Sequence, residues 1–277
     1  MFDSLMVPID GSEFSAHAVP IAGAIARASD ASVRVVGVAR DDGELAWVSD
    51  HVRDAASLLP SDISPRTEVY IDGDPVGVLR QLVRDASCVA CLATHDHLKL
   101  TSQMLHSVGS QLIERAPQPV LAVGAKADAA TLADDVVVAV DGVGDPDPLL
   151  AVATAWASRL HAPLRIVTVY EPVLPDLRRP AHFTRRHGPP LDADDFVEAL
   201  RRRADEMKLA NVRVTGTAIP DPVSVAAGLT SYLEGHPALM LVAGSGHHAG
   251  VHVRPGVVRD LLRVVAFPVL IVNRQES

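Results

Sequence analysis

Two cysteines, Cys88 and Cys91, stand in the C-x-x-C spacing that redox and zinc centres use. They fall inside an apolar run that is typical of a buried strand, where residues three apart point to opposite faces of a sheet. The two sulfurs would therefore not meet, and the chain has no further cysteine to complete a zinc site. We expect both thiols to pack in the core.

Histidine, a common transition-metal ligand, gathers in two segments of the chain. The members are His95, His97 and His106 in one segment and His247, His248 and His252 in the other. A metal site needs three or four convergent ligands with supporting contacts, and loops rarely supply them. We therefore expect exposed loop histidines and no metal.

The residue patterns of common catalytic centres do not occur in this sequence. There is no Ser-His-Asp order, paired-carboxylate cleft, P-loop lysine or dinucleotide fingerprint. What recurs is an Asp-Gly pair directly after an apolar run, at Asp10-Gly11 and again at Asp141-Gly142. Each reads as a buried strand that ends in a turn, and the turns could be purely structural.

The two Asp-Gly turns belong to an internal repeat. An Ala-rich stretch with helical spacing follows each turn, and a second apolar run follows at 33–38 and 164–169, at an offset of 131 residues between the copies. The apolar positions with helical spacing are Ala18, Ile21, Ala22 and Ile25 in the first copy and Leu149, Val152, Ala153 and Trp156 in the second.

Further landmarks recur in the same order. Asp74-Pro75 and Asp221-Pro222 each suit the start of a helix, with Asp as the cap and Pro at the first helical position. Fourth strands follow at 88–93 and 238–243, and last strands at 119–123 and 268–272. Strands that alternate with helices predict a parallel, doubly wound sheet. We expect domains at 1–125 and 135–275, joined by a linker at 126–134.

Composition and charge limit the functional class. The hydrophobic fraction is 48% with only 4% aromatic residues, which suits buried aliphatic strands under Ala-rich helices. A net charge of −9 argues against a nucleic-acid binder. The acidic opening does not fit a signal peptide and no apolar run approaches the roughly 20 residues of a membrane span. We expect a cytoplasmic protein with no membrane contact.

The opening stretch 7–12 (VPIDGS) and the closing stretch 107–123 (SVGSQLIERAPQPVLAV) resemble those of the universal stress protein family. The resemblance extends twice over nearly the whole chain. It implies an α/β fold of two tandem doubly wound domains, each a five-stranded, mostly parallel sheet of order 3-2-1-4-5 with helices on both faces. It also implies dimerisation through the last strand. In this tandem chain the two copies would pair with each other as an intrachain pseudo-dimer, and a homodimer of two chains is left open.

The resemblance further implies an adenine-nucleotide pocket at the carboxyl ends of the first and fourth strands, where strand order reverses. The carboxylates of Asp10 and Asp141 would contact the ribose side, and backbone near Val38 and Val169 would meet adenine. The phosphates would meet a glycine-rich loop, because bare backbone N–H groups and a helix N-terminus favour anions. The family spacing is glycine, two residues, glycine, nine residues, then Gly-Ser or Gly-Thr.

The first copy departs from that spacing. Its three glycine positions hold Ala93, Asp96 and His106, and only Ser107 is kept. Asp96 would place a carboxylate where phosphate belongs, and close like charges repel by an energy of order 1 kcal/mol or more. We expect no nucleotide in the first domain.

The second copy fits the spacing better. It keeps Gly244 and Ser245, has His247 at the second glycine position, and offers Gly256 in a loop about two residues shorter, with Arg254 as a possible phosphate contact. We expect ATP or a related adenine nucleotide here, with or without Mg²⁺; a glycine-bearing loop without a ligand is the other interpretation.

The second copy also carries an insertion, 171–190, that contains Arg178, Arg179, Arg185 and Arg186. The simplest interpretation is a solvated surface loop. The more specific hypothesis is that the insertion covers the second pocket or binds an acidic partner. The whole pattern predicts a non-catalytic stress-response regulator, with slow incidental ATP hydrolysis left open. The alternative is a scaffold for unknown protein partners whose degenerate pockets bind no nucleotide.

Overall fold

The computed structural model describes residues 2–84, 87–94, 108–116, 118–140, 145–170, 193–207, 212–220, 225–244 and 256–273. The first half consists of β1 (Ser4–Ile9), α1 (Glu13–Ser29), β2 (Ser32–Ala39), α2 (Leu45–Ala56), β3 (Arg66–Ile71), α3 (Pro75–Leu82), β4 (Cys88–Ala93), α4 (Val108–Arg115) and β5 (Val120–Val123). The second half consists of β6 (Val136–Ala139), α5 (Asp147–Arg159), β7 (Leu164–Tyr170), α6 (Ala193–Met207), β8 (Val214–Pro220), α7 (Val225–Gly235), β9 (Met240–Gly244), α8 (Gly256–Val264) and β10 (Val269–Val272).

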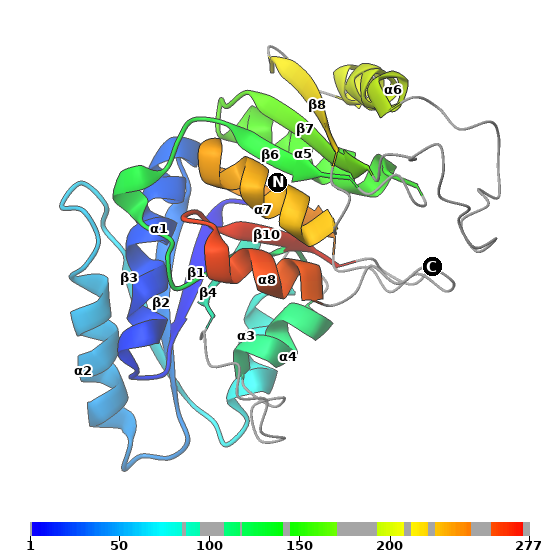
Figure 1. Cartoon of the computed structure of the whole chain (residues 1–277). Helices are drawn as coiled ribbons and strands as arrows, with labels where there is room; N and C mark the ends of the chain where they lie inside the picture. The colour runs from blue at the N-terminus through cyan, green and yellow to red at the C-terminus, as the bar shows by residue number, and fades with distance from the viewer. Residues whose placement is uncertain are drawn as a thin grey trace.

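The strands form one ten-stranded sheet of order β3-β2-β1-β4-β5-β10-β9-β6-β7-β8 (Figure 1). Within each half the neighbouring strands are parallel, and each half has the predicted order 3-2-1-4-5. The halves meet where β5 and β10 pair antiparallel, with Leu121 opposite Leu270. This pairing confirms the predicted intrachain pseudo-dimer and covers two edges that would otherwise be open to other chains.

Helices cover both faces of the sheet, as the fold class predicts. Buried side chains of α1, α2, α5 and α6 pack on one face, and those of α3, α4, α7 and α8 pack on the other. Successive strand residues alternate between the two faces. Cys88 and Cys91 accordingly lie in cores on opposite faces, both as free buried thiols, so the expected core role is confirmed.

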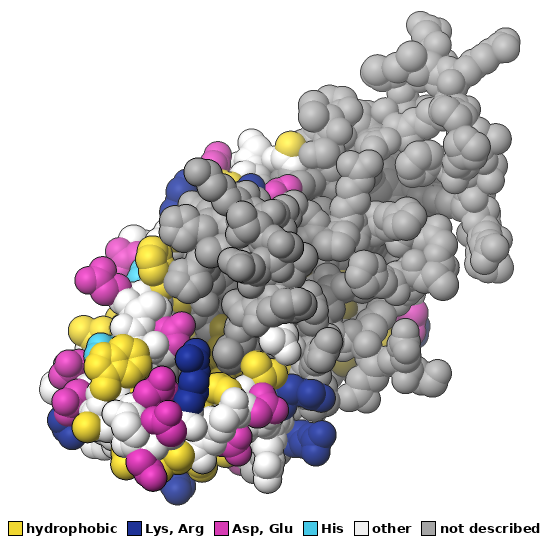
Figure 2. Space-filling model, turned by 90° about the horizontal axis from the view of Figure 1, so that it is seen from below, with side chains coloured by type: hydrophobic (Ala, Val, Ile, Leu, Met, Phe, Trp, Pro, Cys, Tyr) yellow, Lys and Arg dark blue, Asp and Glu magenta, His cyan; other side chains and the backbone are white. Residues whose placement is uncertain are grey.

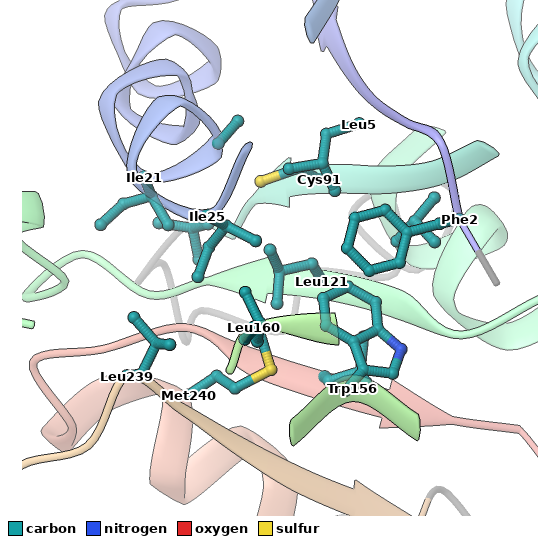
Figure 3. Close-up of a cluster of buried hydrophobic side chains, with 14 of the residues drawn as sticks. Phe2, Leu5, Ile21, Ile25, Cys91, Leu121, Trp156, Leu160, Leu239 and Met240 are labelled. Carbon is teal, nitrogen blue, oxygen red and sulfur yellow. The ribbon is translucent and has the colours of Figure 1, made fainter. Parts of the chain in front are cut away.

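One hydrophobic core passes from the first half to the second without a break (Figure 3). Phe2, which precedes β1, stacks on Trp156 of α5 with ring centroids 4.2 Å apart. Leu121 of β5 and Met240 of β9 are fully buried in the same cluster. The two halves therefore share apolar contacts in addition to the strand pair, and folding of one supports folding of the other.

Both last strands are followed by a residue that contacts the opposite half. Gly124 follows β5, and a Cβ atom there would lie 1.9 Å from the carbonyl oxygen of Leu262 in α8. Asn273 follows β10, and its Nδ2 donates to the carbonyl oxygens of Ile113 (2.7 Å) and Ala116 (3.1 Å) at the end of α4. The amide thus satisfies carbonyls that a helix leaves without intrahelical partners.

The predicted linker, 126–134, is an ordered connection with a short 3-10 turn, η2 (Ala129–Thr131). Ala127 is buried, the N–H of Asp128 donates to the carbonyl of Ala266, and the N–H of Ala133 donates to that of Ala238. It therefore packs against the second half. The domain boundaries at 125 and 135 stay a prediction.

Local details confirm part of the helix and strand assignment. The stripe Ala18, Ile21, Ala22, Ile25 is buried, and Asp74 accepts the N–H of Gly77 in front of Pro75 as the cap of α3. In the second stripe Ala153 and Trp156 are buried as predicted, whereas Leu149 and Val152 are only half-buried and Leu150 and Ala157 line the core instead. The pair Asp221-Pro222 lies outside the described residues.

The strand expected at 238–243 begins later, at Met240, because its register is set by Val136 of β6. Two further strands, β3 and β8, form the outer edges of the sheet. Within the described residues no helix has the length and apolar character needed to cross a bilayer.

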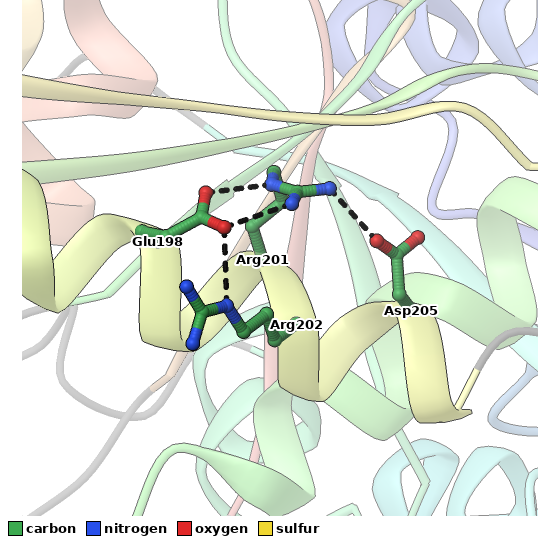
Figure 4. A network of polar contacts seen from close by, with 4 residues as sticks. All are labelled: Glu198, Arg201, Arg202 and Asp205. Carbon is green, nitrogen blue, oxygen red and sulfur yellow. Dashed lines mark hydrogen bonds and ion pairs between the residues drawn. The ribbon is translucent and has the colours of Figure 1, made fainter.

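Charged side chains of α6 form a network along its surface (Figure 4). Arg201 pairs with both Glu198 and Asp205, and Arg202 adds a second contact to Glu198. Hydrogen bonds from Arg201 and Arg202 lower the pKa of Glu198 to about 2. The paired residues are three or four positions apart, and such pairs stabilise the exposed face of a helix.

An arginine occupies the same place on the second strand of each half. Arg34 of β2 makes two hydrogen bonds of 2.9 Å to the carboxylate of Glu68, and Arg165 of β7 pairs with Asp135. The hydroxyl of Tyr70 also donates to Glu68, at 2.5 Å. Hydrogen bonds from Arg34, with a smaller contribution from Tyr70, lower the pKa of Glu68.

The Arg34–Glu68 pair predicts a loss of stability in acid. Because the folded-state pKa of Glu68 is below its usual value of 4.5, the stabilisation is complete above that value and is lost as pH falls through the folded-state pKa. Hydrogen bonds to charged groups contribute about 1.5 to 3 kcal/mol. We expect Glu68→Gln to lower the unfolding free energy at pH 7 by about that amount and to flatten its slope below pH 4.5. Urea unfolding between pH 3 and 7 measures both; an unchanged acid slope would contradict the assignment.

Candidate functional site

The candidate site of each half lies where the sheet reverses its strand order. β1 stands between β2 and β4, and β6 stands between β7 and β9, all of them parallel. In such sheets the crevice for a ligand opens at the carboxyl ends of the central strands. Asp10 follows β1 there, and Gly244 ends β9.

Half of the predicted nucleotide contacts lie among the described residues: Asp10, Val38, Val169, Gly244 and Gly256. The others lie outside them: Asp141, Ser245, His247, Arg254 and Ser107. The two histidine segments and the arginines of the insertion also lie outside. Among the described residues no three His, Cys, Asp or Glu side chains converge on a possible metal position.

In the first half the Asp-Gly turn forms a defined cap for α1. The Oδ1 of Asp10 accepts hydrogen bonds from the N–H (2.9 Å) and hydroxyl (2.6 Å) of Ser12. Ser12 in turn accepts the N–H of Ser15 as the N-cap of α1. Gly11 has φ +83°, a left-handed conformation that glycine adopts without strain. The Asp10 carboxylate thus has a structural role, and it is exposed to solvent at the carboxyl end of β1.

Trp47, in the first turn of α2, covers the same turn. A Cβ atom on Gly11 would lie 2.2 Å from Cη2 of the indole, so the ring packs directly on the glycine. A second glycine allows this approach: at Gly37 of β2 a Cβ would lie 2.4 Å from Val48 of α2. The absence of side chains at Gly11 and Gly37 therefore brings α2 and its indole against the end of β1.

The second half is built differently at the position equivalent to Gly37. Thr168 of β7 is buried there, and its hydroxyl donates to the carbonyl of Val140 at 2.7 Å, tying the end of β6 to β7. The helix after β7, α6, packs on the edge strand instead: a Cβ at Gly216 of β8 would lie 2.3 Å from Val197. In this half, α6 therefore lies over the edge strand β8 and away from the central strand β6.

The first glycine position of the phosphate loop lies at the same point of the sheet in both halves, as the strand registers show. Ala93 pairs with Val123 in the first half, and Gly244 pairs with Val272 in the second. Among the described residues no atom would lie within 4 Å of a Cβ added at Gly244, so the space beside its backbone is unfilled by them. Gly256 is the first residue of α8, on the other side of the loop. The arrangement leaves bare backbone at a strand end and a helix start, which suits an anion.

Val38 and Val169 occupy matching places near the carboxyl ends of β2 and β7. Val169 is buried under α7 and α8, and Val38 is half-buried on the α3 and α4 side. Their side chains therefore pack in the core, which leaves the backbone of these positions as the part that could face a ligand.

Trp47 is the feature of the site that sequence reasoning missed. It stands eight residues after the end of β2 and in the first turn of the next helix, and parallel sheets bring such positions to the carboxyl edge of the sheet. Only two tryptophans occur in the chain. A rare aromatic residue at that position was the available signal.

One family model matches the first half of the chain. The model of the universal stress protein family matches residues 1–124. No curated protein matches the chain.

Three solved structures illustrate the similarity. A universal stress protein from Archaeoglobus fulgidus is 16% identical, with 99% of each chain covered and a TM-score of 0.65. A functionally unknown protein from Pseudomonas aeruginosa is 14% identical, with 98% of this chain and 92% of that chain covered and a TM-score of 0.56. A universal stress protein in complex with cAMP is 24% identical, with 44% of this chain and 96% of that chain covered and a TM-score of 0.37. The first two establish that the whole chain has a known fold.

Proposed function

Because residues 1–124 belong to the universal stress protein family and the second half repeats their strand order, we propose that this protein is a stress-response regulator that binds ATP or a related adenine nucleotide in its second half. The regulator is non-catalytic. It acts by presenting a surface that depends on the bound nucleotide, and Mg²⁺ binds together with the phosphates.

The observation that carries the proposal is the open backbone at Gly244. It stands at the end of β9, beside the end of β6, and a Cβ added there would have no described atom within 4 Å. At the equivalent place the first half has Ala93, and Trp47 lies against Gly11 beside Asp10. These differences favour the second crevice over the first for a phosphate-bearing ligand.

Gly244→Asp is the direct test of this site. A carboxylate at the end of β9 would repel phosphate by a few kcal/mol. Because about 1.4 kcal/mol of binding free energy corresponds to a tenfold change in affinity, we expect the affinity to fall 10- to 100-fold or more. Because no described atom lies within 4 Å of a Cβ at Gly244, the described part of the fold should tolerate the substitution. We expect calorimetric titration with ATP, with and without Mg²⁺, to give about one site per chain in the parent protein and no measurable site in the variant.

Gly235→Asp is the matched control, since Gly235 ends α7 in the same half and is equally unobstructed. It should bind ATP like the parent protein. Binding that survives Gly244→Asp would move the site elsewhere. No heat at millimolar ATP, together with no nucleotide released from the denatured protein, would reject nucleotide sensing and favour the second candidate, a scaffold for protein partners.

A further inference from the structure

Three of the four large hydrophobic side chains that are exposed among the described residues lie at one end of the first half. Among the described residues the exposed ones are Phe14 (43%), Trp47 (50%), Ile71 (48%) and Leu58 (50%). Phe14 lies in the first turn of α1, Trp47 in the first turn of α2, and Ile71 ends β3. Parallel strands end at a common edge, so these three share the carboxyl end of the sheet. Leu58 follows the other end of α2.

The same loops are strongly acidic. Residues 10–14, 40–47 and 71–74 contain seven carboxylates and one arginine, a local net charge of −6. Nearly all of these carboxylates are exposed, including Glu13, Asp42 and Asp72. Figure 2 views the molecule from this end and shows acidic side chains among hydrophobic ones on the described part of the surface. We call these three segments the acidic–aromatic face.

Trp47 is held in place before any partner arrives. Its indole packs on Gly11 and its ring centroid lies 4.2 Å from that of His51, whose Nδ1 is 2.8 Å from the Trp47 carbonyl oxygen. Half of the side chain nevertheless remains exposed. A rigid aromatic residue that is already ordered loses little conformational entropy on binding, which is typical of interface anchors.

We propose that the acidic–aromatic face docks a basic amphipathic segment of a partner protein. Lysine or arginine side chains would lie over the free part of the indole and beside the surrounding carboxylates, since cations are attracted to both. The apolar side of the segment would cover Phe14 and Ile71, as an amphipathic helix does on a hydrophobic surface. The negative potential disfavours nucleic acid and other anionic partners. This docking does not depend on the proposed nucleotide site.

The experiment uses the full chain and a fluorescein-labelled, 18-residue amphipathic peptide of leucine and lysine. We expect saturable binding by fluorescence anisotropy at 50 mM salt, with affinity falling as salt is raised. Trp47→Ala should weaken binding at least tenfold and Trp47→Phe by less, because the aromatic ring is kept. Leu58→Ala, which removes an equally exposed side chain at the far end of α2, should leave the affinity within twofold.

Charge variants separate docking from general attraction to an acidic protein. Asp42→Asn on the acidic–aromatic face should weaken the peptide several-fold, whereas Glu234→Gln, exposed on α7, should not change it. Circular dichroism confirms that each variant is folded. Equal effects of Trp47→Ala and Leu58→Ala, or of the two charge variants, would overturn the proposal, and so would no saturation by 1 mM protein. Retained peptide binding in Gly244→Asp would show that the two sites are independent.

Discussion

Replacing Trp156 by alanine is expected to lower the unfolding free energy by about 3 to 5 kcal/mol, the usual cost of removing a large buried aromatic side chain. Trp156 is 6% exposed and stacks on Phe2 of the other half, within the core that the halves share. The loss should therefore affect both halves together. Urea unfolding followed by near- and far-ultraviolet circular dichroism measures this: one coincident transition should move to lower urea.

The matched control is Trp47→Ala, the same substitution at an exposed tryptophan. Surface substitutions outside the core usually change stability by a fraction of a kcal/mol, and the contact with Gly11 adds a modest cost, so we expect about 1 kcal/mol. A double-mutant cycle of Phe2→Ala and Trp156→Ala should give a coupling of about 0.5 to 1.5 kcal/mol beyond buried area. If Trp156→Ala costs no more than Trp47→Ala, the shared core does not hold the halves together.

Gly124→Ala is expected to destabilise the protein by about 3 kcal/mol, because the new methyl group has no space. The nearest atoms are the carbonyl oxygen and carbon of Leu262, at 1.9 and 2.9 Å from the added Cβ. Both belong to the backbone of α8, so no side-chain rotation relieves the overlap. Either α8 moves or β5 shifts against β10, and each loosens the junction between the halves. Thermal unfolding by calorimetry reports the loss.

Gly109→Ala provides the comparison, since a Cβ there, in the first turn of α4, has no described atom within 4 Å. Alanine is a better helix former than glycine by roughly 1 kcal/mol within a helix and by less near its end, so this variant should be unchanged or slightly stabilised. A similar small effect for Gly124→Ala would mean that α8 does not approach β5 as closely as the structure shows.

Much of the fold was predictable because its determinants are local. Apolar runs of strand length alternate with helical stripes, and Asp74 with Pro75 marks a helix start by capping chemistry. The repeat of these landmarks predicts two similar units, and the described strands have the expected order in both. The stripe on α5, correct at Ala153 and Trp156 but not at Leu149, shows the limit of this reasoning, since helical spacing accepts Leu149 and Leu150 almost equally until the sheet selects one face.

The candidate site was less predictable, because its state depends on contacts between elements. The Asp-Gly turn and the loss of glycine at Ala93 are visible in the sequence, and the registers align Ala93 with Gly244. That an indole lies on Gly11 depends on how closely α2 approaches β2, which Gly37 permits. A sequence pattern does not give such a distance.

The sequence by itself thus determined the type, order and duplication of the secondary elements, since these follow from propensities and periodicities over a few neighbouring residues. Tertiary structure alone decided how the duplicated units meet and that the indole of Trp47 packs on the Asp-Gly turn of the first half. The antiparallel join of β5 with β10, the approach of Gly124 to Leu262 and the stacking of Phe2 on Trp156 each bring together residues far apart in the chain. Their energies depend on shape at atomic distances, which arises only when both halves are folded.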